Sequence, residues 1–343
     1  MKIFRITGII IFSAVVLCLV CIGVIIFAAF LNSPAETIPA EGALFQVNEK
    51  ESGEHIIVRL ENEKLIRSGL FLRILSKLTG SETSFKKGMY RIKPGNTTLD
   101  IHDILVSGRE EMLKITLLEG WTSSKMALYF EEKGFILAKD FLQIVKSKEI
   151  LEKYRIPADT AEGYLFPDTY YFPVGVSAQA IVIKMIDTFF QKIDEYTIRD
   201  KPYSPEELHK KVIMASIIER EYRSEEEAPI IASVFYNRLK NYMPLESCAT
   251  IAYVISEIKG KPYPKRIYYA DLEIQSAYNT YRYNGLPPGP ISNPGLTALV
   301  ASLSPASTSY LYFVLKDPQA GVHEFSDSFS QHQAAKNLYI KTD

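Results

Sequence analysis

Glu219 is an acidic residue in an apolar setting, within the stretch KVIMASIIEREY at positions 211–222. If this stretch is a helix that turns by about 100° per residue, Glu219 lies on the same side as Val212 and Ala215. A carboxyl group among apolar neighbours has its charged form disfavoured and its pKa raised, as a general acid requires. The pattern therefore indicates either a catalytic acid or one member of a buried ion pair with an Arg or Lys.

A second carboxylate would be needed for glycoside hydrolysis, in which two acidic side chains flank the scissile bond. The candidates for this second position are Glu162, Asp168 and Glu246. Glu221 lies about 200° from Glu219 around the predicted helix, so we expect it to be solvated or to form a salt bridge. The 21 tyrosines would suit stacking on sugar rings, although most of them must serve ordinary packing.

Other kinds of active site find little support in the sequence. The histidines include no close pair on a predicted helix, and HEFSD (323–327) lacks the second His of a zincin, so we expect neither a metal nor a cofactor. No Gly-x-Ser-x-Gly elbow and no phosphate loop occur, which disfavours acyl and phosphoryl transfer. The formal net charge is −1, so we expect no binding of nucleic acid.

An N-terminal apolar segment determines where such a site would operate. Residues 8–31 form an uncharged apolar run of 24 residues, long enough to cross a bilayer as a transmembrane helix. No convincing cleavage site follows the run, so we interpret it as an uncleaved signal anchor. Lys2 and Arg5 precede it and acidic residues follow, so the positive-inside rule predicts that residues 1–7 are cytoplasmic and that the remaining chain is exported.

The exported part is predicted to begin with a linker and a small α+β module. Residues 32–44 are rich in Pro, Ala and Glu and are typical of a tether. The module is predicted over residues 45–111. Its expected elements are a strand at 55–60, a helix at 62–79, a strand at 89–94 and a helix at 98–107 closed by Gly108.

The remaining residues, 112–343, are predicted to form a larger mixed α+β domain. Its expected strands are 112–120, 310–315 and 323–326, and its expected helices are 123–133, 137–147, 177–198, 204–222 and 328–340. Ser204, Pro205 and Glu207 supply an N-cap, a first-turn proline and a capping box for the helix that carries Glu219.

The end of that helix and the long segment beyond it also have sequence signals. Ser224 and Glu227 repeat the capping-box signal, so two helices are expected to meet near residue 223. The segment 260–295 is rich in Tyr, Pro, Gly and Asn, which predicts an ordered loop rather than regular structure.

Several long motifs resemble those of the YceG-like endolytic murein transglycosylase family (the MltG type), in the same order and over nearly the whole chain. They are FKKGMYRIKPG (85–95), LLEGWT (117–122), EGYLFPDTYYF (162–172), ASIIEREY (215–222), ASVFYNRL (232–239), YNTYRYNGLPPGPISNPG (278–295) and YLYFV (310–314). The resemblance implies that the small module is LysM-like and that the larger domain is catalytic. The first Glu of the ASIIEREY-like motif is the family's catalytic acid, which implies this role for Glu219.

The resemblance also implies the reaction. It is cleavage of the MurNAc–GlcNAc β-1,4 bond within peptidoglycan strands, which leaves a 1,6-anhydro-MurNAc end and limits strand length. The sugar's own 6-hydroxyl is the nucleophile, so no second carboxylate is needed. By motif membership, Asn237, Tyr278, Asn279 and Tyr281 are implied to position the substrate, a role that would raise effective molarity.

One segment departs from the family pattern. Where the family usually shows Leu-Gln-x-Asp-Pro-Thr, this chain reads LESCATI at 245–251. Glu246, Cys248 and Ala249 replace the Gln, Asp and Pro of the pattern, whereas Leu245 and Thr250 are retained.

Together these features predict a single-pass protein of the bacterial cytoplasmic (inner) membrane whose extracytoplasmic catalytic domain acts on nascent peptidoglycan strands. The resemblance suggests contact with the peptidoglycan synthesis machinery. Two alternatives remain at this point. One is a peptidoglycan hydrolase that uses a second carboxylate, for which Glu246 is a candidate. The other is a non-catalytic glycan-binding scaffold of the cell wall, in which Glu219 belongs to a structural ion pair.

Overall fold

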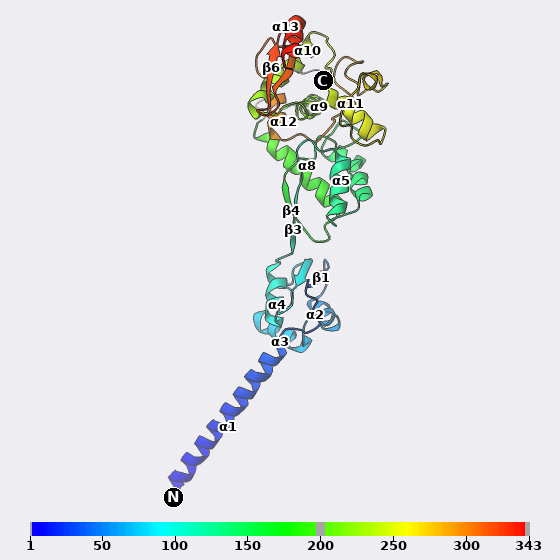
Figure 1. Cartoon of the computed structure of the whole chain (residues 1–343). Coiled ribbons are helices and arrows are strands. Elements are labelled where there is room, and N and C mark those ends of the chain that lie inside the picture. The colour runs from blue at the N-terminus through cyan, green and yellow to red at the C-terminus, as the bar shows by residue number, and fades with distance from the viewer. Residues whose placement is uncertain (1, 197–202, 340–343) are drawn as a thin grey trace. The chain divides into compact units, whose positions relative to one another are not determined.

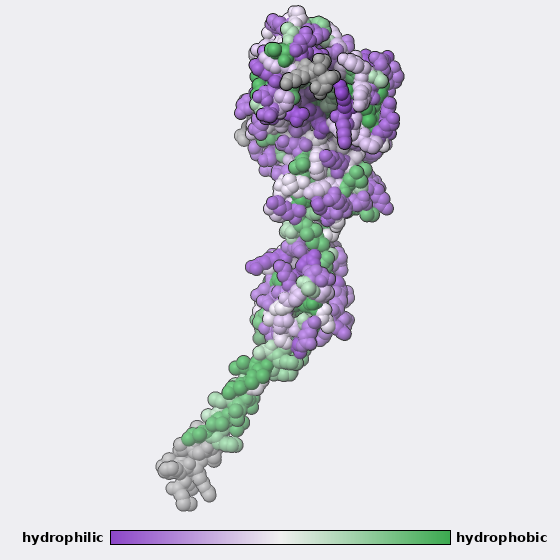
Figure 2. Space-filling model, in the orientation of Figure 1, coloured by the Kyte–Doolittle hydropathy of each residue, from purple (hydrophilic) through white to green (hydrophobic). Residues whose placement is uncertain are grey.

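The computed structural model describes residues 2–196 and 203–339 and has a mixed α+β architecture (Figure 1). The first helix, α1 (Lys2–Leu31), contains the segment Ile11–Leu31, whose mean hydropathy is 3.2. Among the described residues this is the one helix long and apolar enough to cross a membrane, and its side chains form the apolar rod visible in Figure 2. The helix therefore meets the length requirement of a bilayer span.

The chain divides into two compact units. The first is Met1–Leu113 with Tyr171–Gly175, and the second is Lys114–Tyr170 with Val176–Asp343. In the first unit, β1 (Ala43–Val47) pairs antiparallel with β2 (Gly88–Ile92). Its other elements are the helices α2 (Gly53–Asn62), α3 (Gly69–Thr79) and α4 (Thr98–Ser107). Phe45 and Tyr90 face each other across the strands and are fully buried, so they form the centre of a small core.

Two predictions for this unit are wrong. The segment 55–60 is part of helix α2, because Ile56, Ile57 and Leu60 are buried at a helical spacing. The helix predicted over 62–79 begins only at Gly69, where the Ser68 hydroxyl accepts a hydrogen bond from a backbone N–H of α3. A short apolar run does not distinguish a strand from a buried helix, which explains the first error.

The segment predicted as a tether is partly packed. Ile38 is buried in the core of the first unit, and the Thr37 hydroxyl donates to the carbonyl oxygen of Lys64 at 2.9 Å. β1 then begins at Ala43, so the segment after Leu31 does not behave as a free random coil. The domain boundaries derived from the sequence stay predictions.

The second unit is mostly helical. Strands β3 (Met112–Thr116) and β4 (Thr169–Pro173) form a two-stranded sheet. The helices are α5 (Ser123–Glu132), α6 (Ala138–Val145), α7 (Lys148–Lys153), α8 (Ala178–Asp194), α9 (Pro205–Ile218), α10 (Ala228–Lys240), α11 (Cys248–Tyr253), α12 (Leu296–Leu303) and α13 (Phe329–Tyr339). The short turns of helix are η1 (Glu225–Glu227), η2 (Val254–Ile258), which continues α11, and η3 (Tyr269–Glu273).

A second pair of strands completes this unit. The antiparallel hairpin of β5 (Tyr312–Asp317) and β6 (Val322–Ser326) packs against α13 near the C-terminus, as Figure 1 shows in orange and red. Strand β4 and helix α12 were not predicted from the sequence. The last residues of the predicted helices 177–198 and 328–340 lie outside the described residues.

Helix α9 is the central helix of the second unit and leads directly to Glu219. Every residue from Val212 to Ile218 is buried, because α10 and α12 both pack against this helix. The capping box of Ser204 and Glu207 is confirmed, and Pro205 occupies the first turn. The helix ends at Ile218, four residues earlier than predicted.

The second predicted capping box is wrong. Ser224 makes no capping bond to the next helix. The Glu227 carboxylate instead accepts hydrogen bonds from the backbone N–H of His323, and its Oε2 lies 2.7 Å from the Nδ1 of the same histidine. A long-range contact with β6 has therefore taken the side chain that the local pattern assigned to the cap.

We predict that Ser204→Ala lowers the free energy of unfolding of the second unit by about 1 kcal/mol, because an N-cap hydrogen bond of α9 is lost. Urea denaturation followed by the fluorescence of Trp121, the single tryptophan of the chain, measures this unit. Ser147→Ala is the matched control, since Ser147 precedes α7 without a capping bond. Equal losses in the two variants would contradict the assignment.

Candidate active site

Glu219 is the first residue after α9 and keeps its backbone in a helical conformation. Its N–H donates to the carbonyl oxygen of Ala215 at 2.8 Å, and its Oε2 accepts a hydrogen bond from the backbone N–H of Gly295 at 2.9 Å. The pKa of Glu219 is raised to about 8, chiefly by burial; the Gly295 hydrogen bond and Arg220 lower it, and the nearby Glu119 raises it. Desolvation therefore outweighs the groups that favour the charged form.

The hydrogen bond from Gly295 depends on how the segment 291–295 is held. All five residues of this segment are buried. The backbone N–H of Ile291 donates to the Ser216 hydroxyl at 3.0 Å, and the Ser292 hydroxyl donates to the Ser216 carbonyl at 3.1 Å. The segment is thus fixed to the same helix that carries Glu219.

Asn293 holds this segment from the other side. Its Oδ1 accepts from the backbone N–H groups of Gly163 and Leu165, and its Nδ2 donates to the carbonyl of Trp121 and to a carboxylate oxygen of Glu162. This buried amide therefore has partners from two separate segments of the chain, Trp121 and residues 162–165. Buried polar groups that are fully paired specify one arrangement of the backbone around them.

The three candidates for a second carboxylate are all engaged elsewhere. Glu162 is buried and accepts hydrogen bonds from the backbone N–H and the hydroxyl of Ser123 at the start of α5, and burial raises its pKa to about 7. Asp168 is exposed and accepts from the backbone N–H of the next residue. Glu246 pairs with Arg238 at 2.9 Å.

The carboxylate that does act on Glu219 is Glu119, which no periodic pattern had identified. Gly295 lies against both side chains, because its N–H binds Glu219 and a Cβ at this position would collide with the carboxyl group of Glu119. Burial and the nearby Glu225 raise the pKa of Glu119. The motif LLEGWT contains this residue, but only the fold reveals its neighbour.

The prediction for Glu221 is wrong. Its side chain is half-buried rather than freely solvated, and its Oε1 accepts a hydrogen bond from the Ser247 hydroxyl at 2.5 Å, while burial raises its pKa. Its backbone N–H bonds to Ile218 within a turn, so the helical spacing used in the prediction no longer applies after Ile218. Glu221 thereby connects the turn after α9 to the segment 245–251.

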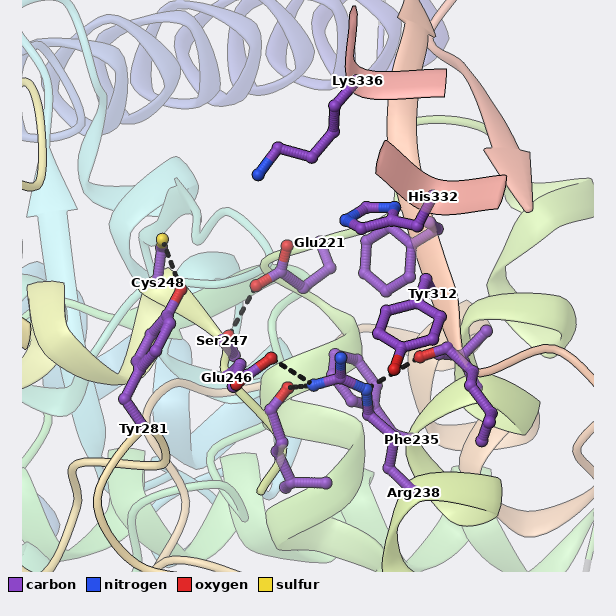
Figure 3. Close-up of a pocket in the computed structure, with 14 residues that line it drawn as sticks. Glu221, Phe235, Arg238, Glu246, Ser247, Cys248, Tyr281, Tyr312, His332 and Lys336 are labelled. Atoms are coloured by element: carbon purple, nitrogen blue, oxygen red, sulfur yellow. Dashed lines mark hydrogen bonds and ion pairs between the residues drawn. The ribbon is translucent and has the colours of Figure 1, made fainter. Parts of the chain in front are cut away.

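Glu221 also lines a cavity of about 310 Å³ (Figure 3). Figure 3 shows Lys336 and His332 on the opposite wall from Cys248 and Tyr281. The Tyr281 hydroxyl lies 3.0 Å from the Cys248 sulfur. The departure from the family pattern at Cys248 and Glu246 therefore falls on the wall of this cavity.

A larger cavity of about 630 Å³ lies beside Glu219 and is lined by its neighbour Arg220 and by Gly120, Tyr253 and Tyr263, among others. Glu219 lies directly behind the lining residue Gly120, because a Cβ at Gly120 would lie 3.4 Å from the Cγ of Glu219. The Arg220 guanidinium donates to the Gly120 carbonyl at 3.0 Å and to the Tyr263 hydroxyl at 2.6 Å. The volume falls within the range of about 300–1,000 Å³ that is usual for ligand sites.

The four residues predicted to position the substrate do not form one cluster. Asn237 donates from Nδ2 to two backbone carbonyls before β5, and the buried Asn279 donates to two carbonyls within its own loop. The ring of Tyr278 packs on Tyr253, with 5.1 Å between centroids, and Tyr281 lines the smaller cavity. The asparagines organise loops, whereas the tyrosines lie at or behind cavity walls.

A half-buried carboxyl group with a raised pKa beside a cavity is the arrangement of an enzyme that uses a general acid. A model of the YceG-like family matches residues 45–338, and the chain belongs to this family. The resemblance inferred from the motifs is therefore confirmed.

Two of the similar proteins have the same name, endolytic murein transglycosylase. The chain is 31% identical over 339 residues to the endolytic murein transglycosylase of Bacillus subtilis, with 93% of this chain and 91% of that protein covered. It is 28% identical over 296 residues to the endolytic murein transglycosylase of Streptococcus pneumoniae serotype 2, with 78% of this chain and 53% of that protein covered. The crystal structure of a YceG-like protein from Listeria monocytogenes matches with a TM-score of 0.56 and 30% identity, over 86% of this chain and 99% of that chain.

We predict that Glu219→Gln stabilises the fold at pH 8 and has little effect near pH 4.5. The pKa of Glu219 is about 8 in the folded state against an ordinary value of 4.5, so ionisation favours the unfolded state increasingly between these two values. The variant cannot ionise, and we expect a gain of about 2–4 kcal/mol at pH 8. Urea denaturation of the 343-residue chain in detergent micelles at both pH values measures it.

The control for this experiment is Glu131→Gln, which neutralises an exposed carboxylate on α5. It should change the free energy of unfolding by less than about 0.5 kcal/mol at either pH. A gain in Glu219→Gln that is the same at pH 4.5 and pH 8 would contradict the raised pKa.

Proposed function

We propose that this protein is a membrane-anchored lytic transglycosylase that cleaves the MurNAc–GlcNAc β-1,4 bond within peptidoglycan strands and leaves 1,6-anhydro-MurNAc ends. The observation that carries the proposal is the Glu219 carboxyl, which is half-buried at the end of α9, has a raised pKa, accepts a hydrogen bond from the Gly295 N–H and lies next to residues that line a cavity of about 630 Å³. Membership of the YceG-like family and relatives named endolytic murein transglycosylase support the enzyme class and the substrate.

In the proposed reaction Glu219 acts first as an acid. With a pKa of about 8 it is mostly protonated at neutral pH and donates its proton to the glycosidic oxygen as the bond from that oxygen to C1 breaks. Positive charge then develops on the sugar ring, and Glu219 becomes a carboxylate. The Gly295 N–H stabilises this carboxylate, because a hydrogen bond to the charged form is strongest when the charge is present.

Glu219 then acts as a base. Its carboxylate accepts the proton of the sugar's 6-hydroxyl while the oxygen of that hydroxyl bonds to C1, which closes the 1,6-anhydro ring. The acid returns to its protonated form and no water is consumed. Because the nucleophile belongs to the substrate, correct positioning supplies its effective molarity without a second carboxylate.

The state of the other carboxylates favours this reaction over hydrolysis. A hydrolase needs a second group free to activate water or to attack the sugar. Glu162 is enclosed by Ser123 and Asn293, and Glu246 is paired with Arg238. Their engagement leaves neither Glu162 nor Glu246 free for that second role.

The substrate would occupy the cavity next to Glu219. Tyr253 and Tyr263 on its wall offer aromatic faces for sugar rings. Tyr278 supports the ring of Tyr253, and Tyr281 would contact a neighbouring part of the strand from the smaller cavity. Asn237 and Asn279 would act on the substrate only through the loops that they hold.

The N-terminal part would place the enzyme at the membrane. We assign residues 8–31 as a single transmembrane anchor of the cytoplasmic membrane with residues 1–7 inside, which the length and apolar surface of α1 support. The small module of residues 45–111 would present glycan to the catalytic domain of residues 112–343 in the manner of a LysM-like domain. Nascent strands and the peptidoglycan synthesis machinery are the expected partners at this location.

We predict that the wild-type chain in detergent micelles releases 1,6-anhydro products from purified glycan strands, and that Glu219→Gln lowers the rate by at least about 100-fold, because the proton donor is lost. Mass spectrometry of the products measures both. Glu131→Gln should cleave at the wild-type rate. Glu246→Gln should still give anhydro products, because Glu246 is paired with Arg238 and takes no part in the reaction.

The alternatives give different results in the same experiment. Products that carry an added water, together with loss of activity in Glu246→Gln, would identify a hydrolase. Strands that stay intact with the wild-type chain would identify a binding protein and would contradict the proposed function.

A further inference from the structure

We propose that Glu119 is a positioning residue for this reaction, whose carboxylate keeps the proton on Glu219 until the substrate takes it. The proposal rests on the proposed function and adds a residue that acts through the acid. Three features support it, namely a shared contact on Gly295, a fixed loop, and the balance of charges around the acid.

The shared contact is the first feature. The N–H of Gly295 donates to Oε2 of Glu219 at 2.9 Å. The space where the Cβ of any larger residue at position 295 would lie is filled by the carboxyl group of Glu119. Because the Cβ and the amide nitrogen belong to the same residue, both carboxyl groups lie against one glycine. Glycine permits this approach because it has no side chain.

The loop that carries Glu119 is held on both sides, so its position is fixed. The N–H of Gly120 donates to the carbonyl of Asn293 at 2.9 Å, and the carbonyl of Gly120 accepts from Arg220 at 3.0 Å. Gly120 has a φ of +71°, a conformation that favours glycine and allows the loop to approach the Cγ of Glu219. The residues next to Glu119 and next to Glu219 are therefore bonded to each other.

The charges around Glu219 come from three segments. Glu119 faces it from the loop before α5, Arg220 from the turn after α9, and Tyr222 lies in the same turn. Glu225 on η1 acts in turn on Glu119 and Tyr222. The guanidinium of Arg220 is partly engaged by the Gly120 carbonyl and the Tyr263 hydroxyl.

Two carboxyl groups, those of Glu119 and Glu219, thus lie close together beside Gly295, and Arg220 acts on the second of them. Carboxyl groups close together do not all ionise, and the proton is retained by the one for which ionisation costs most. Burial makes Glu219 that group, and Glu119 adds to the rise in its pKa. The side chain of Glu119 is exposed, so its charged form costs less than that of the more enclosed Glu219.

The same charge would assist both halves of the reaction. Before bond cleavage, ionised Glu119 disfavours loss of the Glu219 proton to water. After cleavage, it disfavours the Glu219 carboxylate again and so promotes return of the proton from the 6-hydroxyl. It also adds negative potential near the sugar ring while positive charge develops there.

The test is the pH dependence of glycan cleavage by the full chain in detergent micelles. The wild-type rate should fall as Glu219 ionises, near pH 8. In Glu119→Gln we expect the rate to fall at a pH that is lower by about one unit. The rate at pH 8 should then be reduced about 5- to 10-fold, whereas the rate at pH 5.5 should stay within about twofold of wild type. Glu119→Ala should show the same shift, and Glu119→Asp should retain the wild-type profile.

Glu131→Gln is the matched control, since it neutralises an exposed carboxylate on the helix that follows the loop, and it should leave the profile unchanged. A rate loss in Glu119→Gln that is equal at every pH would indicate a structural role and would overturn the proposal. An unchanged profile in both neutral variants would overturn it as well.

A direct titration separates this inference from the proposed function. In the chain labelled with ¹³C at glutamate carboxyl carbons, the resonance absent from Glu219→Gln reports the ionisation of Glu219. Its midpoint should fall by about one unit in Glu119→Gln, whether or not glycan is cleaved. Wild-type chain that cleaves no glycan would refute the function, whereas an unmoved midpoint would refute the role of Glu119.

Discussion

The withdrawal of one carboxyl group from water is the constraint on which the site depends. Such a group must lose its charge, find a cation or accept strong hydrogen bonds, because an isolated buried charge is too costly. Glu219 accepts one backbone hydrogen bond, from Gly295, and its adjacent Arg220 is directed in part toward Gly120 and Tyr263. These groups compensate only in part for the loss of water around Glu219. Its carboxyl group therefore keeps a proton at neutral pH, at which an ordinary glutamate would be ionised.

This incomplete compensation is maintained by well-paired surroundings. The segment 291–295 is polar, contains proline and lies in the interior, yet its hydrogen-bonding groups find partners on α9, on the Gly120 loop and around Glu162. The side chain of Asn293 makes four hydrogen bonds, which connect its segment to Trp121 and to residues 162–165. The hydrogen bonds of this network stabilise the fold and offset the cost of keeping the Glu219 carboxyl away from water. Such local destabilisation is common at functional sites.

Local signals were sufficient for part of this arrangement. The capping box at Ser204 and the position of Glu219 after an apolar run are local, and they identified the helix and the acid. The strand predicted at 55–60 failed because a short apolar run is compatible with both a strand and a buried helix. Glu221 and Glu119 were misjudged or missed because their environments come from Ser247 and Gly295, which are distant in the sequence. Motif resemblance supplied the substrate, which no residue pattern indicated.

The central claim is that Glu219 is protonated at neutral pH, and infrared difference spectroscopy tests it most directly. The spectrum of Glu219→Gln is subtracted from that of the wild-type chain at a series of pH values. The account predicts a carbonyl band of a protonated carboxylic acid at pH 7, which is replaced by carboxylate bands as the pH rises through about 8. Carboxylate bands alone at pH 7 would contradict it.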